Sequence, residues 1–112
     1  MKTIWSNKIE SILKMGKPLD SIGVNNWALS KKEALIAIEK LTQECVPILG
    51  GDVYEMINGR LKSTYDSWYC DIEEDESENS FLIRSIDKAG TYIRKYNARN
   101  ANAIYFVIVP KA

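Results

Sequence analysis

The side chains that commonly carry out enzyme chemistry are scarce in this sequence. Its 112 residues include no histidine, which excludes histidine acid–base catalysis, Ser-His-Asp and Cys-His sites, and zinc sites that require imidazole. The two cysteines, Cys45 and Cys70, are too few for a disulfide framework or a four-thiolate metal site. Cys70 also has no basic neighbour in the sequence that would favour a reactive thiolate. We therefore expect no cofactor, no metal ion and no catalytic cysteine.

Two aspartates remain as candidates for catalysis. Asp52 and Asp66 would lie almost opposite each other in a predicted hairpin, and a pair of carboxylates can act as general acid and base. The alternative is that each carboxylate holds a turn or a backbone amide. No other acid, base or nucleophile accompanies the pair, so we favour the second interpretation and expect that the protein is not an enzyme.

A run of carboxylates lies at the end of the acidic part of the chain. Six of the eight residues from position 71 to 78 are acidic: Asp71, Glu73, Glu74, Asp75, Glu76 and Glu78. The net charge of the chain is zero, but residues 50–80 carry two basic and nine acidic side chains, and residues 81–112 carry six basic and one. The run is either a solvated loop that favours the positive end of the next helix or an anionic surface for a basic partner.

An aromatic segment precedes the acidic run. Residues 65–70 read Tyr-Asp-Ser-Trp-Tyr-Cys, and these rings either build the core or anchor an interface, where Trp and Tyr contribute much of the binding energy. The candidate partner-binding residues are Asp66, Trp68, Tyr69, Asp71, Glu73, Glu74, Asp75, Glu76 and Glu78. The basic side chains that follow, Arg84 among them, form the solvent face of a helix or pair with the acidic run.

Apolar periodicity and capping residues predict three helices. The first covers residues 3–15, with Thr3 as its cap. The second begins at Ser30, which forms a capping box with Glu33. The third is capped by Ser80 and runs to residue 96 or 97. The buried stripes of the second and third helices are Ala34, Leu35, Ile38, Leu41 and Cys45, and Leu82, Ile86, Ala89, Ile93 and Tyr96.

Three strands are predicted as well. The Asn58-Gly59 pair is a strong signal for a two-residue turn, and it joins residues 48–57 and 60–72 in a hairpin that pairs Glu55 with Lys62. Residues 103–109 are a continuous apolar run, which indicates a strand buried on both faces.

The hairpin contains a conflict between its two apolar faces. Tyr54, Met56, Leu61 and Tyr65 share one face, which we expect to be the core face, whereas Trp68 falls on the other. Either a bulge near residues 66 and 67 resets the alternation, or Trp68 is exposed.

The elements together predict an α+β fold with the order α-α-β-β-α-β. A three-stranded, mainly antiparallel sheet in the order second-first-third carries the helices, in a single domain of residues 1–112. The sequence has no apolar core typical of a signal peptide near its start and no apolar stretch of about 18 residues, so we expect a cytoplasmic protein that does not contact membranes. The zero net charge disfavours nucleic acid as a partner.

Several short motifs resemble the immunity protein 40 family of bacterial polymorphic toxin systems. Residues 50–54 read Gly-Gly-Asp-Val-Tyr, and the aromatic segment at 65–70, Ser80, the Ala-Gly-Thr-Tyr-Ile of residues 89–93 and the upstream Trp-Ala-Leu of residues 27–29 follow the family layout. The resemblance covers roughly residues 20–110, and Ser67 departs from it, because the family often has Asn there. It implies a cytoplasmic α+β protein that binds and neutralises a cognate toxin. It supplies no catalytic residue and does not identify the toxin-binding face.

The absence of catalytic apparatus independently favours a binding protein. We expect a stoichiometric inhibitor of a protein toxin, for instance a basic nuclease domain, which an acidic surface would attract over long range. The alternatives are a cytoplasmic adaptor with a non-toxin partner and, less favoured, a small enzyme that uses Asp52 and Asp66. The oligomeric state is left open.

Overall fold

The computed structural model describes residues 5–112 and has the predicted α+β fold. The elements in chain order are α1 (Asn7–Leu13), β1 (Lys17–Pro18), the short 3-10 helix η1 (Asp20–Ile22), β2 (Trp27–Ala28), α2 (Lys31–Gln43), β3 (Ile48–Ile57), β4 (Arg60–Tyr69), α3 (Glu78–Lys95) and β5 (Ile104–Pro110). The order of the long elements is the predicted one. The small strands β1 and β2 lie between the first two helices and were not among the three predicted strands.

The main sheet has the order β4-β3-β5 and is antiparallel throughout, as predicted. Asn58 and Gly59 form the hairpin turn, both with positive φ, and Glu55 pairs with Lys62 in the predicted register. β1 and β2 pair with each other in a separate two-stranded sheet. The predicted topology of the three long strands is therefore confirmed.

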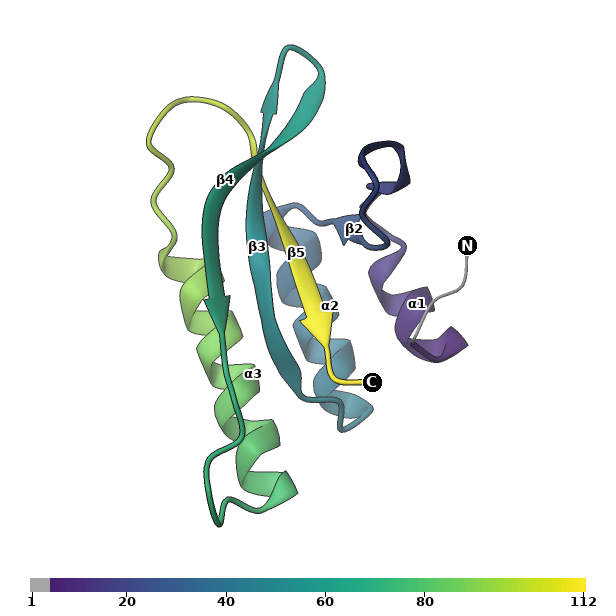
Figure 1. Cartoon of the computed structure of the whole chain (residues 1–112), viewed down its shortest axis with the longest axis vertical. Helices are drawn as coiled ribbons and strands as arrows, with labels where there is room; N and C mark the ends of the chain where they lie inside the picture. Colours follow the sequence, from purple (N-terminus) through teal and green to yellow (C-terminus); the bar gives the residue numbers. More distant parts are fainter. Residues whose placement is uncertain (1–4) are drawn as a thin grey trace.

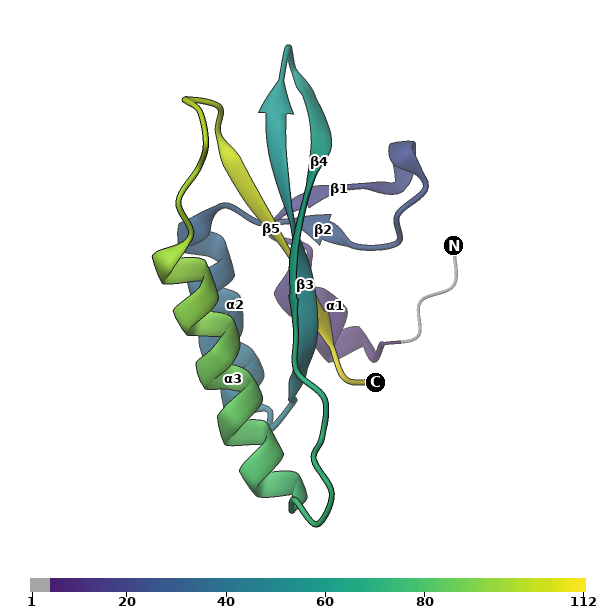
Figure 2. The same cartoon turned by 60° about the vertical axis from the view of Figure 1, so that its left-hand side comes forward.

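Other elements pack on both faces of the main sheet, and only one face carries helices α2 and α3 (Figures 1 and 2). Helices α2 and α3 lie on one face, where Val53, Phe106 and Ile108 belong to the main core. The β1–β2 arm lies over part of the other face, where Val107 packs in a smaller cluster with Leu19 and Ala28. β5 is thus buried on both faces, as its continuous apolar sequence predicted.

The caps of two helices differ from the predicted ones. α1 is capped by Ser6, whereas Thr3 lies outside the described residues. α3 is capped by Ser77, whose hydroxyl accepts the backbone N–H of Ser80 at 3.1 Å. Ser80 is therefore inside the helix, because a serine three residues upstream satisfies its amide. The capping box of Ser30 and Glu33 at the start of α2 is confirmed, with bonds of 2.9 and 3.2 Å.

The buried stripes of α2 and α3 are confirmed at most positions. Ala34, Ile38 and Leu41 are buried, but Cys45 is exposed, because α2 ends at Gln43 and the backbone of Cys45 turns into a left-handed conformation with φ of 57°. In α3, Ala89 and Ile93 are buried, and Leu82, Ile86 and Tyr96 are half-buried.

Neither expected answer to the conflict between the two faces of the hairpin holds, because the bulge in β4 does not reset the alternation and Trp68 is nevertheless buried. Tyr54 pairs with Ser63 and Asp52 with Ser67, so β4 contains two residues more than β3 in this interval. An insertion of two residues leaves the alternation of side chains unchanged. Trp68 therefore stays on the face opposite Leu61, and it is buried there because that face carries the helices. The expectation that the Tyr54 and Leu61 face holds the main core was wrong.

Candidate functional site

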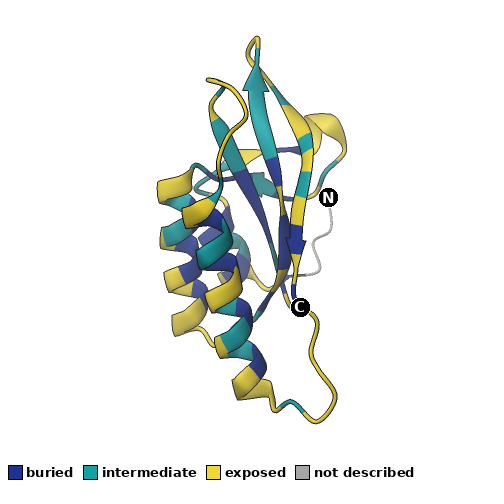
Figure 3. Ribbon diagram, turned by 90° about the vertical axis from the view of Figure 1, so that its left-hand side faces the viewer, coloured by how far each residue is buried: buried dark blue, intermediate teal, exposed yellow. Residues whose placement is uncertain are grey.

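The acidic segment, residues 71–78, connects β4 to α3 and projects at one end of the molecule, opposite the hairpin tip (Figure 1). It is almost entirely exposed (Figure 3), and only Glu76 is half-buried. Glu78 is the first residue of α3, where the positive end of the helix dipole favours a carboxylate. The six carboxylates that the sequence pointed to are thus brought together on one short connection.

One arginine on α3 holds the acidic segment in place. Arg84 donates to both carboxylate oxygens of Glu76 at 2.8 Å, and to the backbone carbonyl of Asp71 at 2.5 Å. Its guanidinium also lies 3.5 Å from the carboxylate of Glu73 and donates to the sulfur of Cys70. A planar guanidinium suits this arrangement because it presents several donors in a fixed fork. The predicted pairing of the basic helix with the acidic run is confirmed for Arg84.

The carboxylates of the acidic segment fall into two groups. Hydrogen bonds from Arg84 and from the backbone amide of Glu73 lower the pKa of Glu76 from 4.5 to about 2. Glu73 shares the same guanidinium. The carboxylates of Asp71, Glu74, Asp75 and Glu78 form no ion pair within residues 5–112 and lie at the surface. These four side chains keep their charge available to a partner.

Trp68 is not the surface anchor that the sequence suggested. Its side chain is 6% exposed and stacks on Tyr92 of α3, with ring centroids 4.8 Å apart. Gly51 lies directly beneath the indole ring, and a Cβ added there would come within 2.2 Å of it. The indole N–H is buried without an acceptor among residues 5–112. Trp68 is a core residue because its face of the sheet packs against α3.

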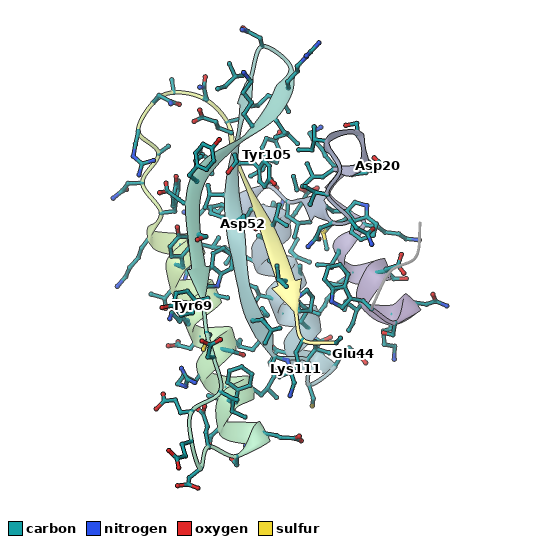
Figure 4. All side chains as sticks on the ribbon, viewed as in Figure 1. Asp20, Glu44, Asp52, Tyr69, Tyr105 and Lys111 are labelled. Atoms are coloured by element: carbon teal, nitrogen blue, oxygen red, sulfur yellow. The ribbon has the colours of Figure 1, made fainter. Side chains whose placement is uncertain are left out.

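Two tyrosines of β4 have exposed rings: Tyr69, two residues before the acidic segment, and Tyr65, in the bulge farther along the strand. Tyr69 (Figure 4) is 70% exposed. The ammonium of Lys88 lies 5.3 Å from the centre of its ring, a cation–π contact. Tyr65 is 92% exposed and occupies the bulge with φ of 67°. Tyr65 was expected in the core, and its position in an unpaired bulge is what the sequence pattern could not show.

The two aspartates proposed for catalysis do not face each other. Asp66 accepts hydrogen bonds from the hydroxyl of Tyr96 at 2.6 Å and from both terminal nitrogens of Arg99 at 2.9 and 3.0 Å. The hydrogen bonds from Arg99, and to a smaller extent the one from Tyr96, lower the pKa of Asp66. Asp52 pairs with Ser67 and Val107, which places it on the sheet face opposite the helices. Asp66 therefore ties the end of β4 to α3 and to the chain that follows it.

Within residues 5–112, no group of three or more cysteine or carboxylate side chains is placed to hold a metal ion. None of the helices in this range is long and apolar enough to cross a membrane.

A family model identifies the chain. The model of immunity protein 40 matches residues 18–110, which run from β1 to the end of β5. The chain belongs to the immunity protein 40 family. No curated protein and no solved structure gave a significant match. In this member of the immunity protein 40 family, the matched range includes the acidic segment, Arg84 and Tyr69, and it excludes α1.

Proposed function

We propose that the protein binds a cognate bacterial toxin and neutralises it by forming a stoichiometric complex. The observation that carries the proposal is the acidic segment, which Arg84 holds in place at one end of the molecule. The chain that carries this segment belongs to an immunity protein family. The proposed contact surface consists of this segment and the exposed rings of Tyr69 and Tyr65. Asp66 supports the surface from within, and Trp68 is left out of it because its side chain is buried.

The order imposed by Arg84 supports a role in binding. A free loop of eight residues would lose conformational entropy when a partner immobilised it. Here the guanidinium of Arg84 already fixes the backbone of Asp71 and the side chain of Glu76. Part of the conformational entropy of the loop is therefore lost during folding and not on binding. The unpaired carboxylates are therefore presented from a connection that is fixed at several points.

The chemistry of the surface favours a basic partner. Four unpaired carboxylates on one short connection create a local negative potential, which accelerates the approach of a positively charged surface. Toxins that cleave nucleic acids need such a surface to bind phosphates. An inhibitor that covers this surface needs no catalytic group of its own, and we propose that the protein acts without turnover.

The proposal is tested with the toxin domain encoded next to this gene. Production of that domain alone should arrest bacterial growth, and production with this protein should restore it. Titration of the purified toxin domain with this protein should give a complex of one toxin to one inhibitor. Loss of toxicity at far below equimolar amounts would point to catalytic inactivation and would contradict the proposed mechanism. A lack of both rescue and binding would favour an adaptor with a different partner.

A further inference from the structure

An apolar groove opens at the same end of the molecule as the acidic segment. It lies between α1, the α2–β3 connection and the first turns of α3, and it has a volume of about 560 Å³. This size is within the range of ligand-binding clefts. Its larger apolar lining side chains are Ile9, Val46, Pro47, Phe81 and Leu82.

Leu82 is the lining residue that most needs an explanation. Ile9 belongs to the main core and Val46 packs against it, whereas Leu82 is half-buried and does not contribute to that core. Its neighbour Ile83 is 62% exposed and does not line the groove. Covering half-exposed apolar surface in a concave site with an apolar group lowers the free energy of the complex.

The groove and the acidic segment are joined through α3. Glu78 belongs to the acidic segment and lines the groove. Phe81, a buried lining residue, lies 5.7 Å below the guanidinium of Arg84, which binds Glu76. Lys111, just past the end of β5 (Figure 4), is the cation among the lining residues. A partner that covers this end of the molecule therefore meets an apolar hollow flanked on one side by carboxylates.

We propose that the groove receives an apolar side chain of the toxin, and that basic residues flanking this side chain bind the acidic segment. The inference rests on the proposed function and specifies the chemistry of the partner. Charge complementarity decides the occupant, because four unpaired carboxylates, Glu78 among them, repel an acidic partner and attract a basic one. The apolar side chain is the buried anchor of such an interface, and the ion pairs form its rim.

Two substitutions at consecutive positions of α3 test the proposal. Leu82→Arg places a charge in the groove, and Ile83→Arg places the same charge on the exposed side of the helix. Both change the net charge equally, so long-range attraction of the toxin should weaken to the same extent. Leu82→Arg should additionally increase the dissociation rate at least ~10-fold in surface plasmon resonance, the loss typical of a buried anchor. Leu82→Gln removes the apolar surface without adding charge and should give the same direction of change.

Cys45 gives a second measurement that needs no substitution in the groove. Its side chain lines the groove and is exposed, whereas Cys70 is buried. A maleimide should therefore react at Cys45 in the free protein, and bound toxin should slow this reaction, since an occupied groove excludes the reagent.

The outcomes distinguish the two proposals. If the unmodified protein does not bind the toxin, the proposed function fails. If it binds but Leu82→Arg and Ile83→Arg dissociate equally fast, or if the toxin leaves the reaction of Cys45 unchanged, the groove proposal alone is overturned. Self-association that Leu82→Arg abolishes and Ile83→Arg preserves would also overturn it, because the occupant would then be a second copy of this chain.

Discussion

Trp68 and Tyr69 are neighbours in the sequence, but their side chains lie in opposite environments. Trp68 faces the helices and is buried, and Tyr69 is exposed beside the acidic segment. Alternation along a strand requires this difference, and the helical cover of one face decides which ring is buried. The roles of the two rings follow from it, since Trp68 stabilises the fold and Tyr69 is available to a partner.

We expect Trp68→Ala to destabilise the protein by about 3–5 kcal/mol, because it removes a buried ring and leaves a cavity beside Tyr92. Urea unfolding followed by circular dichroism measures this change. Trp68→Phe should cost distinctly less, since an aromatic ring remains and the indole N–H has no acceptor among the described residues. If the Trp68→Ala variant kept its stability but dissociated faster from the toxin, the prediction would be wrong, and Trp68 would be a residue of the toxin interface.

Glu76 should make the free energy of unfolding depend on pH in the acidic range. Its pKa is about 2 in the folded chain against a usual 4.5, so the ionised form favours folding. This contribution is complete above pH 4.5 and is lost as the pH falls toward 2. In urea unfolding at several pH values, Glu76→Gln should therefore be less stable than the wild type at pH 7, and the difference should shrink toward pH 2. Glu74→Gln, whose carboxylate forms no ion pair within residues 5–112, is the matched control and should keep the wild-type pH dependence.

At the scale of elements, the β4–α3 connection combines two kinds of carboxylate. Glu73 and Glu76 bind Arg84 and hold the connection to α3, whereas the unpaired ones face solvent. Substitutions that aim at charge alone must therefore avoid the two carboxylates that bind Arg84, because reversing Glu76 would release the backbone as well. Exposed charges are screened over about 8–10 Å at physiological salt, so each should contribute little to the affinity by itself.

Reversal of two unpaired charges should slow the encounter with a basic toxin. We expect Asp71→Lys with Glu74→Lys to reduce the association rate about 10-fold at low salt, to weaken its salt dependence, and to leave dissociation nearly unchanged. Stopped-flow binding at two salt concentrations measures these rates. Asp20→Lys with Glu39→Lys makes the same change in net charge at η1 and α2 and serves as the control. Equal effects of the two pairs would show that only net charge matters and that the acidic segment has no special role.

At the scale of the whole molecule, distant parts of the chain protect one edge of the sheet. The outer edge of β5 is covered by the connector before α2, where Leu29 and Phe106 exchange backbone hydrogen bonds of 2.7 and 2.8 Å. Asn26 donates to the carbonyl of Ile108 at 2.9 Å, and the indole of Trp5 donates to that of Pro110 at 3.1 Å. An edge covered in this way cannot pair with another chain. The molecule extends over 45 Å along its longest axis, and the acidic segment and the hairpin tip lie at its opposite ends (Figure 1).

We expect Asn26→Ala to destabilise the protein by about 1–3 kcal/mol, because the carbonyl of Ile108 would stay buried without its donor. Thermal unfolding measures the change. Asn97→Ala, at an exposed position after α3, is the control and should have little effect. If Asn26→Ala lowered the thermal stability no more than Asn97→Ala does, the hydrogen bond from Asn26 to the edge of β5 would contribute nothing to stability.

The sequence by itself determined the features that depend on local chemistry. Asn58 and Gly59 specified the hairpin turn because both residues tolerate positive φ, and Ser30 with Glu33 specified the start of α2 through reciprocal hydrogen bonds. The apolar run of β5 indicated burial on both faces, and the carboxylates of the acidic segment indicated the candidate surface.

Only the tertiary structure decided what covers each face of the sheet, and hence that Trp68 is buried and Tyr65 exposed. Alternation separates two faces but does not say which one meets the helices, and a two-residue bulge leaves that alternation unchanged. The contacts that Arg84 makes with Glu76 and the backbone of Asp71 likewise depend on how the connection folds back on α3.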